Sequence, residues 1–161
     1  MKPYRILWLG CCLAVAGCGG DKSPGRNYDK EIDRLMGRMT LAEKIGQMNQ
    51  VSGQSNPTGV LKQYSSLEGR VREGKIGTVL NVTGAATTRE LQRIAVEETR
   101  LGIPLIFALD VIHGYKTISP VPLAESCSWD MSAIEASARM AAVEASAAGL
   151  QWTFAPMVDI A

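Results

Sequence analysis

The stretch Ile103-Pro-Leu-Ile-Phe-Ala-Leu-Asp-Val-Ile-His-Gly114 decides the fold. Residues 105–109 are apolar without alternation, which indicates a strand buried on both faces, as in a parallel sheet covered by helices. Asp110 ends the apolar run, and His113 begins a loop. In parallel α/β folds, ligands bind at the carboxyl ends of the strands. Because burying a charge is costly, a carboxylate at this position indicates a functional residue.

Two further strands and two connecting helices are predicted around this stretch. The strands cover 76–82 and 150–158. The first connecting helix opens with a capping box at Thr87–Glu90, and the second is capped by Ser132. The residues of the first helix expected to face the sheet are Leu91, Ile94 and Ala95. This alternation of strands and helices argues for a parallel sheet with right-handed crossovers.

Helices are also predicted ahead of the first strand. One carries a single apolar face made by Ile32, Leu35, Met36 and Met39. The next begins with a capping box of Thr40 and Glu43. The apolar residues that this second helix should bury are Leu41, Ile45 and Met48. Another helix is predicted from Val60 to Val71, ending near Gly74.

The amino-terminal residues are typical of an export signal rather than of a folded segment. Lys2 and Arg5 form a positive region. The apolar core that follows, 6–16, is shorter than the roughly 20 residues that span a bilayer. It ends in Val15-Ala16-Gly17-Cys18, which resembles the lipobox of bacterial lipoproteins. In that family the signal is cut before the cysteine, and the cysteine carries the lipid.

The lipobox resemblance predicts how the chain is organised. We expect a signal peptide at 1–17, a tether at 18–28 that starts with lipidated Cys18, and a folded domain at 29–161. The protein would then be exported to the periplasm or the outer membrane and held to the membrane by its lipid. The alternative is an ordinary signal cut after a small residue, with that cysteine incidental. Cys127, alone after the cut, is expected to be a packed residue rather than a nucleophile.

Composition and missing motifs exclude several functions. With 17 basic and 16 acidic residues there is no basic excess that would indicate nucleic-acid binding. The 46% hydrophobic content is that of a soluble globular protein. The sequence shows neither a dinucleotide-binding glycine motif nor a phosphate-binding loop, and no Cys/His metal cluster. We therefore expect neither a cofactor nor a metal.

Four segments together resemble the amino-terminal domain of glycoside hydrolase family 3, with the periplasmic type of β-glucosidase most similar. They are Arg38–Met48, Gly74–Gly77, Ile103–Gly114 and Trp152–Asp159. The resemblance covers 29–161 and keeps the family's order and spacing. It implies that the sequence forms the lead-in helices and about three parallel strands of a (β/α)8 barrel of the TIM type. A complete barrel takes about 250 residues, so we expect the chain to be a fragment.

The resemblance implies a role for Asp110 and a substrate class. At this position the family has an aspartate that binds hydroxyl groups of the terminal sugar. The nucleophile and the acid/base would lie beyond Ala161, so no catalytic residue is expected here and the fragment alone should be inactive. The full-length protein would hydrolyse terminal β-D-glycosyl residues, and its partner would be a β-glycoside or an oligosaccharide. β-Xylosides and β-N-acetylglucosaminides are alternative substrates; a non-catalytic sugar-binding lipoprotein and an inactive remnant are alternative functions.

The residues alone would suggest a different assignment for two aspartates. Asp110 and Asp159 both follow predicted strands. Retaining glycosidases hold two carboxyl groups about 5 Å apart, and neighbouring strands are about 4.8 Å apart. The resemblance argues against a catalytic pair, and we expect Asp159 to lie near the site without doing chemistry. His113 is expected to order its loop by hydrogen bonding, and Trp152, in mid-strand, to be a core residue rather than a sugar-stacking one.

Overall fold

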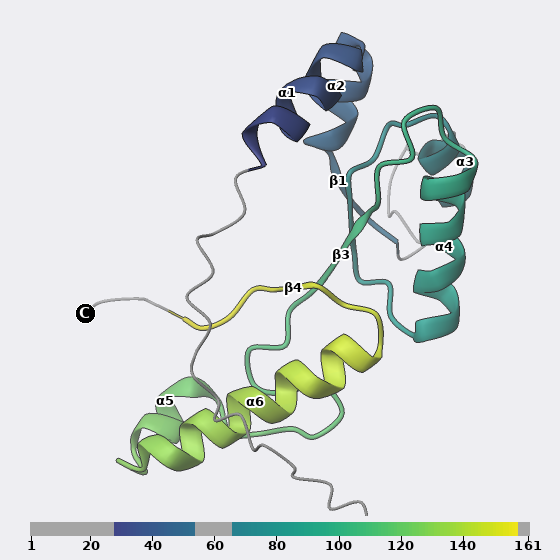
Figure 1. Cartoon of the computed structure of the whole chain (residues 1–161). Helices are drawn as coiled ribbons and strands as arrows, with labels where there is room; N and C mark the ends of the chain where they lie inside the picture. The colour runs from purple at the N-terminus through teal and green to yellow at the C-terminus, as the bar shows by residue number, and fades with distance from the viewer. Residues whose placement is uncertain (1–27, 54–65, 158–161) are drawn as a thin grey trace, which may run out of the picture.

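A parallel sheet with helices packed on it is the centre of the molecule. The computed structural model describes residues 28–53 and 66–157. Within them, four parallel strands pair in the order β1-β2-β3-β4, so that their order in space follows their order in the chain (Figure 1). The strands are β1 (Gln50–Ser52), β2 (Thr78–Leu80), β3 (Ile106–Leu109) and β4 (Trp152–Thr153). The predicted parallel α/β architecture is confirmed.

The strand boundaries correct the sequence prediction. β1 was not predicted, because its three residues are too few to show an alternating pattern. The described part of the chain therefore contains four strands where about three were expected. β2 and β4 are shorter than the predicted 76–82 and 150–158. The last residue of the latter prediction, Val158, lies outside the described residues.

Six helices are present in the described ranges, and the residues at their N-termini can be compared with the predicted capping residues. The helices are α1 (Asp29–Arg38), α2 (Leu41–Gln47), α3 (Leu67–Arg72), α4 (Ala85–Glu97), α5 (Pro122–Ser126) and α6 (Met131–Ala147). The capping box ahead of α2 is confirmed, since Thr40 Oγ1 accepts from the Glu43 amide at 3.2 Å and Glu43 Oε2 accepts from the Thr40 amide at 2.8 Å. Of the helix predicted at 60–71, only the final part falls within the described residues, as α3.

The other two predicted caps are wrong. α4 starts at Ala85, because the chain turns directly out of β2 through Gly84, whose φ of +99° suits glycine. Thr88 therefore lies inside the helix, where its hydroxyl donates to the Gly84 carbonyl at 3.1 Å. α6 is capped by Asp130 instead of Ser132, and Asp130 Oδ1 accepts from two backbone amides at 3.0 Å. A carboxylate is favoured there because it also interacts with the helix dipole.

The core lies between the sheet and helices α3 and α4. Its most deeply buried large side chains are Val71, Val79, Ile94 and Phe107. The three α4 residues predicted to face the sheet are all buried. Residues paired across neighbouring strands share a face, and Val79 pairs with Phe107, so both point toward the helices. The opposite face is less covered: Ile106 is 45% exposed. The prediction of burial on both faces is therefore wrong for Ile106, although Ala108, two residues further on the same face, is buried.

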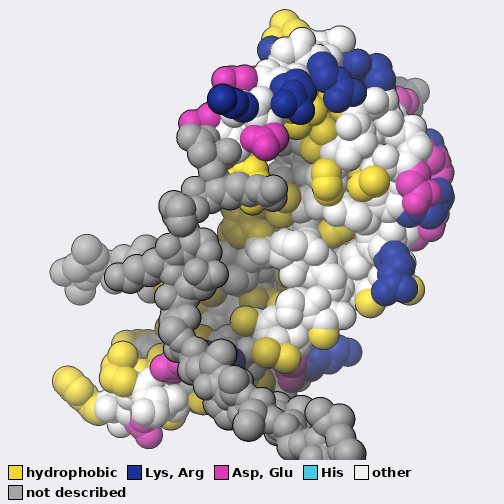
Figure 2. Space-filling model, in the orientation of Figure 1, with side chains coloured by type: hydrophobic (Ala, Val, Ile, Leu, Met, Phe, Trp, Pro, Cys, Tyr) yellow, Lys and Arg dark blue, Asp and Glu magenta, His cyan; other side chains and the backbone are white. Residues whose placement is uncertain are grey.

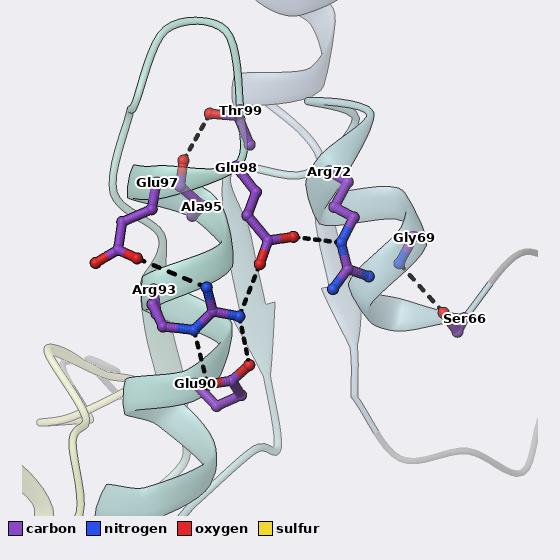
Figure 3. A network of polar contacts seen from close by, with 9 residues as sticks. All are labelled: Ser66, Gly69, Arg72, Glu90, Arg93, Ala95, Glu97, Glu98 and Thr99. Carbon is purple, nitrogen blue, oxygen red and sulfur yellow. Dashed lines mark hydrogen bonds and ion pairs between the residues drawn. The ribbon is translucent and has the colours of Figure 1, made fainter.

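Charged residues join α3 to α4 on the surface above this core (Figure 3). Arg93 of α4 lies among three glutamates and contacts Glu90 at 2.8 Å, Glu98 at 2.7 Å and Glu97 at 3.6 Å. Arg72 of α3 donates to Glu98 at 2.6 Å and so completes the connection between the helices. Hydrogen bonds from Arg72 and then from Arg93 lower the pKa of Glu98. Because exposed ion pairs each contribute little, these contacts orient the helices more than they stabilise them.

The lead-in helices are attached through polar and backbone contacts. The predicted burial of Leu41, Ile45 and Met48 is wrong: all three are exposed, and Met48 is 80% exposed. No residue of α1 is buried either. α2 instead contacts the turn between α3 and β2 at Gly46, where a Cβ atom would collide with the Gly74 carbonyl oxygen. The backbones approach closely on this side of α2, while its large apolar side chains stay exposed.

The helices that follow β3 are much less buried than α3 and α4. Ala145 is the one residue of α6 that is buried, and α5 has none. Figure 2 shows hydrophobic side chains on the surface at the lower left, where Figure 1 places α5 and the start of α6. The large apolar residues exposed in this part include Leu123, Trp129 and Met131. Cys127 is also exposed, so its predicted packed position is wrong.

Candidate functional site

Asp110 stands at the carboxyl end of β3, where the sequence predicted a functional carboxylate. It directly follows Leu109, the last residue of the strand, and it is exposed. Its Oδ1 accepts a hydrogen bond from the Ile112 amide at 3.1 Å, which forms the first turn of the loop. An ionised carboxylate has about four acceptor positions, so this bond leaves capacity for a ligand. The position and exposure of Asp110 are therefore compatible with ligand binding.

Two polar residues on neighbouring strands lie at the same edge, and sequence reasoning missed both. Ser52 ends β1, and Asn81 follows β2 with a φ of +63°. The Asn81 side-chain amide donates to Ser52 Oγ at 3.4 Å. The signal that could have found Asn81 is an asparagine directly after an apolar strand, because asparagine tolerates a left-handed backbone. Ser52 could not be found, because β1 itself was not recognised.

The loop after Asp110 folds back on itself. The Gly114 amide donates to the Val111 carbonyl at 3.1 Å, and the Ser119 amide donates to the His113 carbonyl at 2.8 Å. Gly114 has a φ of +104°, and a Cβ atom there would collide with the Thr117 carbonyl oxygen. Since Val111 is buried, the base of the loop is anchored in the core. Glycine is thus required for this loop to close.

His113 contributes a backbone bond to the loop, and the role predicted for its side chain stays a prediction. Its carbonyl accepts the bond from the Ser119 amide. The ring Nδ1 atom is buried and has no hydrogen-bond partner among the described residues. Buried polar atoms are nearly always paired, so this nitrogen is available to a water molecule or a ligand group. The ring therefore remains a near-site candidate without an assigned role.

Glu144 of α6 holds the tip of the same loop. Its Oε2 accepts from the Lys116 amide at 2.7 Å and from the Thr117 amide at 2.8 Å, and its Oε1 accepts from the Thr117 hydroxyl at 2.6 Å. The Thr117 hydroxyl and these amides lower the pKa of Glu144. Sequence reasoning missed this residue. The only available signal was a charged residue within an otherwise Ala-rich helix.

A groove of about 600 Å³ opens beside this site, between α6 and the ends of β3 and β4. Its walls are mainly apolar and include Leu109, Ala138 and Leu150; neither Asp110 nor His113 is among the described lining residues. Trp152 also lines it and is 44% exposed, so its predicted core position is wrong. The apolar walls make the groove a poor candidate for binding a polar ligand.

Two residues with predicted roles, Cys18 and Asp159, lie outside the described part of the chain. Their roles therefore remain predictions. β3 and β4 are neighbours, but β4 ends at Thr153, so Asp159 does not directly follow the strand as predicted. Over residues 28–53 and 66–157, no group of three or more His, Cys, Asp or Glu side chains is placed to hold a metal ion. No helix in the same ranges combines the length and apolar character of a membrane span.

Comparison with protein families gives one match over most of the chain. The family described as glycosyl hydrolase family 3 N terminal domain matches residues 40–161. Among curated proteins, the chain is 35% identical over 133 residues to the periplasmic beta-glucosidase of Salmonella typhimurium, which is 82% of this chain and 17% of that protein. It is 26% identical over 155 residues to the lysosomal beta glucosidase of Dictyostelium discoideum, covering 82% of this chain and 19% of that protein.

Solved structures give the same result. The β-glucosidase of Listeria innocua in complex with isofagomine matches with a TM-score of 0.70 and 37% identity, over 82% of this chain and 18% of that one. The same enzyme has been solved with glucose, and a mutant of it with laminaribiose. The chain thus spans about a fifth of the length of the relatives that it matches.

Proposed function

Because the chain belongs to glycosyl hydrolase family 3, whose N-terminal domain matches residues 40–161, we propose that it is part of a retaining β-glycosidase. The four parallel strands belong to a domain of the TIM-barrel type. The proposed substrates are terminal, non-reducing β-D-glucosyl residues. Relatives named as β-glucosidases, one of them solved with glucose, support this choice of sugar.

The observation that carries the proposal is the exposed carboxylate of Asp110 at the carboxyl end of β3. An ionised carboxylate accepts hydrogen bonds from two neighbouring sugar hydroxyls, and such charge-assisted bonds are stronger than neutral ones. In barrels of this type, ligands bind at this edge of the sheet. Asp110 is therefore proposed to hold the terminal sugar and not to act as nucleophile or acid/base.

The catalytic carboxylates are proposed to lie beyond residue 161. Since this chain covers 17% and 19% of the two curated relatives, most of a protein of that size would lie elsewhere. A retaining mechanism needs a nucleophile and an acid/base about 5 Å apart. The 161-residue chain is accordingly proposed to bind sugar weakly at best and to be inactive alone.

Replacing Asp110 by Asn in the complete protein tests the proposal, because the variant keeps the shape and removes the charge. Each charge-assisted bond contributes about 1.5–3 kcal/mol, so losing two should lower kcat/KM for an aryl β-D-glucoside by roughly 10²–10⁴. Asp33→Asn, a matched change on α1, should leave kcat/KM unchanged. A destabilised Asp110→Asn protein with normal kinetics would show that Asp110 only orders its loop.

The same assay separates the alternatives by substrate. Aryl β-D-xyloside and β-N-acetylglucosaminide are measured beside the glucoside, and the largest kcat/KM identifies the sugar. Binding of glucose without hydrolysis of any of the three would favour a non-catalytic sugar-binding protein. Neither binding nor hydrolysis would favour an inactive remnant.

We also propose that the protein is exported and lipid-anchored through Cys18. The Val15-Ala16-Gly17-Cys18 order supports lipidation, and the relative named as periplasmic supports export. A single acyl chain anchors weakly, so stable attachment needs more than one. Metabolic labelling with a fatty acid should label the wild type and a Cys127→Ser control but not Cys18→Ser. Equal labelling of all three proteins would contradict the proposal.

A further inference from the structure

We propose that Glu144 is a positioning residue, which fixes the loop after β3 and through it sets Asp110 in place for the sugar. This inference rests on the proposed function, because it assigns Glu144 a part in sugar binding. Glu144 is on α6, and the loop lies 27 and 28 residues earlier in the chain. The contact therefore joins two elements that the local sequence does not hold together.

Two of the three hydrogen bonds to Glu144 come from the loop backbone. Both amides at the tip, those of Lys116 and Thr117, donate to one carboxylate oxygen, and the Thr117 hydroxyl donates to the other. All three distances fall between 2.6 and 2.8 Å, which is short and typical of bonds to an ionised acceptor. Lys116 and Thr117 are themselves exposed, so their own burial does not hold the tip. Glu144 holds it, beside the neighbouring Tyr115, which packs against the core, and the Gly114–Ile118 bridge.

The loop transmits this constraint to Asp110 through a few bonds. From the tip, the chain returns to the Ser119–His113 backbone bond. The other arm passes through buried Val111 to Asp110, whose side chain accepts from Ile112. With the tip released, the loop beyond buried Val111 keeps its own short-range bonds and the packing of Tyr115, and its backbone is less constrained. Since a shift of about 1 Å at a binding group can cost 10²-fold in rate, a mobile loop should weaken sugar binding.

A role in docking α6 is the competing explanation, since the neighbouring Ala145 is the one residue of α6 that is buried. The two explanations differ in what they change. Docking alone would lower the thermal stability and leave KM normal. Positioning would raise KM for the sugar, with a smaller effect on kcat, because it removes binding shared by ground and transition states.

The test uses Glu144→Ala and Glu144→Gln in the complete protein, with Glu135→Gln as the matched control on the same helix. Glu135 is exposed, and its ion pair is a weak one with Arg139 at 3.6 Å. Kinetics are measured with an aryl β-D-glucoside, and hydrogen exchange is followed at the Lys116 and Thr117 amides. We expect Glu144→Ala to raise KM about 10- to 100-fold and to speed exchange at both amides. Glu144→Gln should be intermediate, because its carbonyl still accepts, and Glu135→Gln should match the wild type.

The outcomes are separable. An active wild type whose Glu144→Ala variant exchanges faster at the tip but keeps its KM would overturn this inference and leave the proposed function standing. The same holds if both amides keep their slow exchange. A wild-type protein that neither binds glucose nor hydrolyses any aryl β-glycoside would overturn the proposed function and this inference with it.

Discussion

Two parts of the molecule differ in how far their own residues cover their apolar surfaces. In the covered half, made of β2, β3, α3 and α4, large side chains such as Phe107 and Ile94 are almost completely buried. In the open half, made of β4, α5 and α6, residues of the same kind are exposed, and a groove of about 600 Å³ separates α6 from the strand ends. The open half is no less apolar in sequence than the covered half.

The difference shows that apolar content alone does not determine which part is stable. α3 and α4 lie against each other and against two paired strands, so each apolar face has a partner. α6 carries mainly alanines and contributes one buried residue. Because stability follows buried area, the covered half should supply most of the folding free energy of the described residues.

The largest expected difference in stability between the two halves comes from replacing one phenylalanine in each half by alanine. Phe107 is 1% exposed in the covered half, and Phe154, next to β4, is 41% exposed. Phe107→Ala should cost about 3–5 kcal/mol, because it leaves a cavity in a packed core. Phe154→Ala should cost only about 0.5–1.5 kcal/mol, the contribution of its contact with Trp152, whose ring centroid lies 5.3 Å away. Hydrogen exchange at the Asn81 and Ile106 amides, which bond across β2 and β3, reports both effects.

At about 1.4 kcal/mol per factor of ten, the expected loss of protection for Phe107→Ala is between 10² and 10⁴. The Phe154→Ala protein serves as the control, since it removes the same side chain from the other half. Equal losses for the two variants would mean that the halves fold as one unit. The distinction drawn between them would then be wrong.

A smaller effect concerns how α2 is joined to the covered half. Arg100 donates to Glu43 Oε1 at 2.9 Å and to the Arg38 carbonyl at 2.9 Å. The hydrogen bond from Arg100, with the Thr40 amide, lowers the pKa of Glu43 from 4.5 to about 2. A lowered carboxyl pKa stabilises the folded state above pH 4.5, and this contribution is lost as the pH falls toward 2.

We expect exchange at the α2 amides to accelerate between pH 4.5 and 2, after correction for the intrinsic rate. Glu43→Gln should exchange faster already at neutral pH and should show no further change over this range. Glu31→Gln, a change on α1, should follow the wild-type profile. If the wild type also showed no change down to pH 2, the ion pair would not be holding α2.

Fold class was predictable because it depends on local pattern. The unbroken apolar run before Asp110 indicated a buried parallel strand, and the spacing of Leu91 and Ile94 indicated the buried face of α4. The capping box of Thr40 was predictable because both partners are three residues apart. These features need no knowledge of distant contacts.

The predictions from sequence failed where a contact between residues far apart in the chain determines the local structure. The apolar residues of α2 have the spacing of a helix that packs on a core. The helix instead contacts the turn before β2 through Gly46, and Met48 is exposed. At the site, Asp110 was found because it interrupts an apolar run. Glu144 was missed because its partners lie 27 and 28 residues away and are backbone amides, which leave no mark in the sequence.

The strand order has a consequence for synthesis of the chain. Each strand from β2 to β4 pairs with the strand made just before it. For these four strands, a polypeptide that emerges from its amino terminus therefore presents each pairing edge before the next strand appears. Since chains fold from the amino terminus during translation, β2, α3, α4 and β3 can pack while later residues are still being added. Assembly of the described strands can thus proceed in the order of their synthesis.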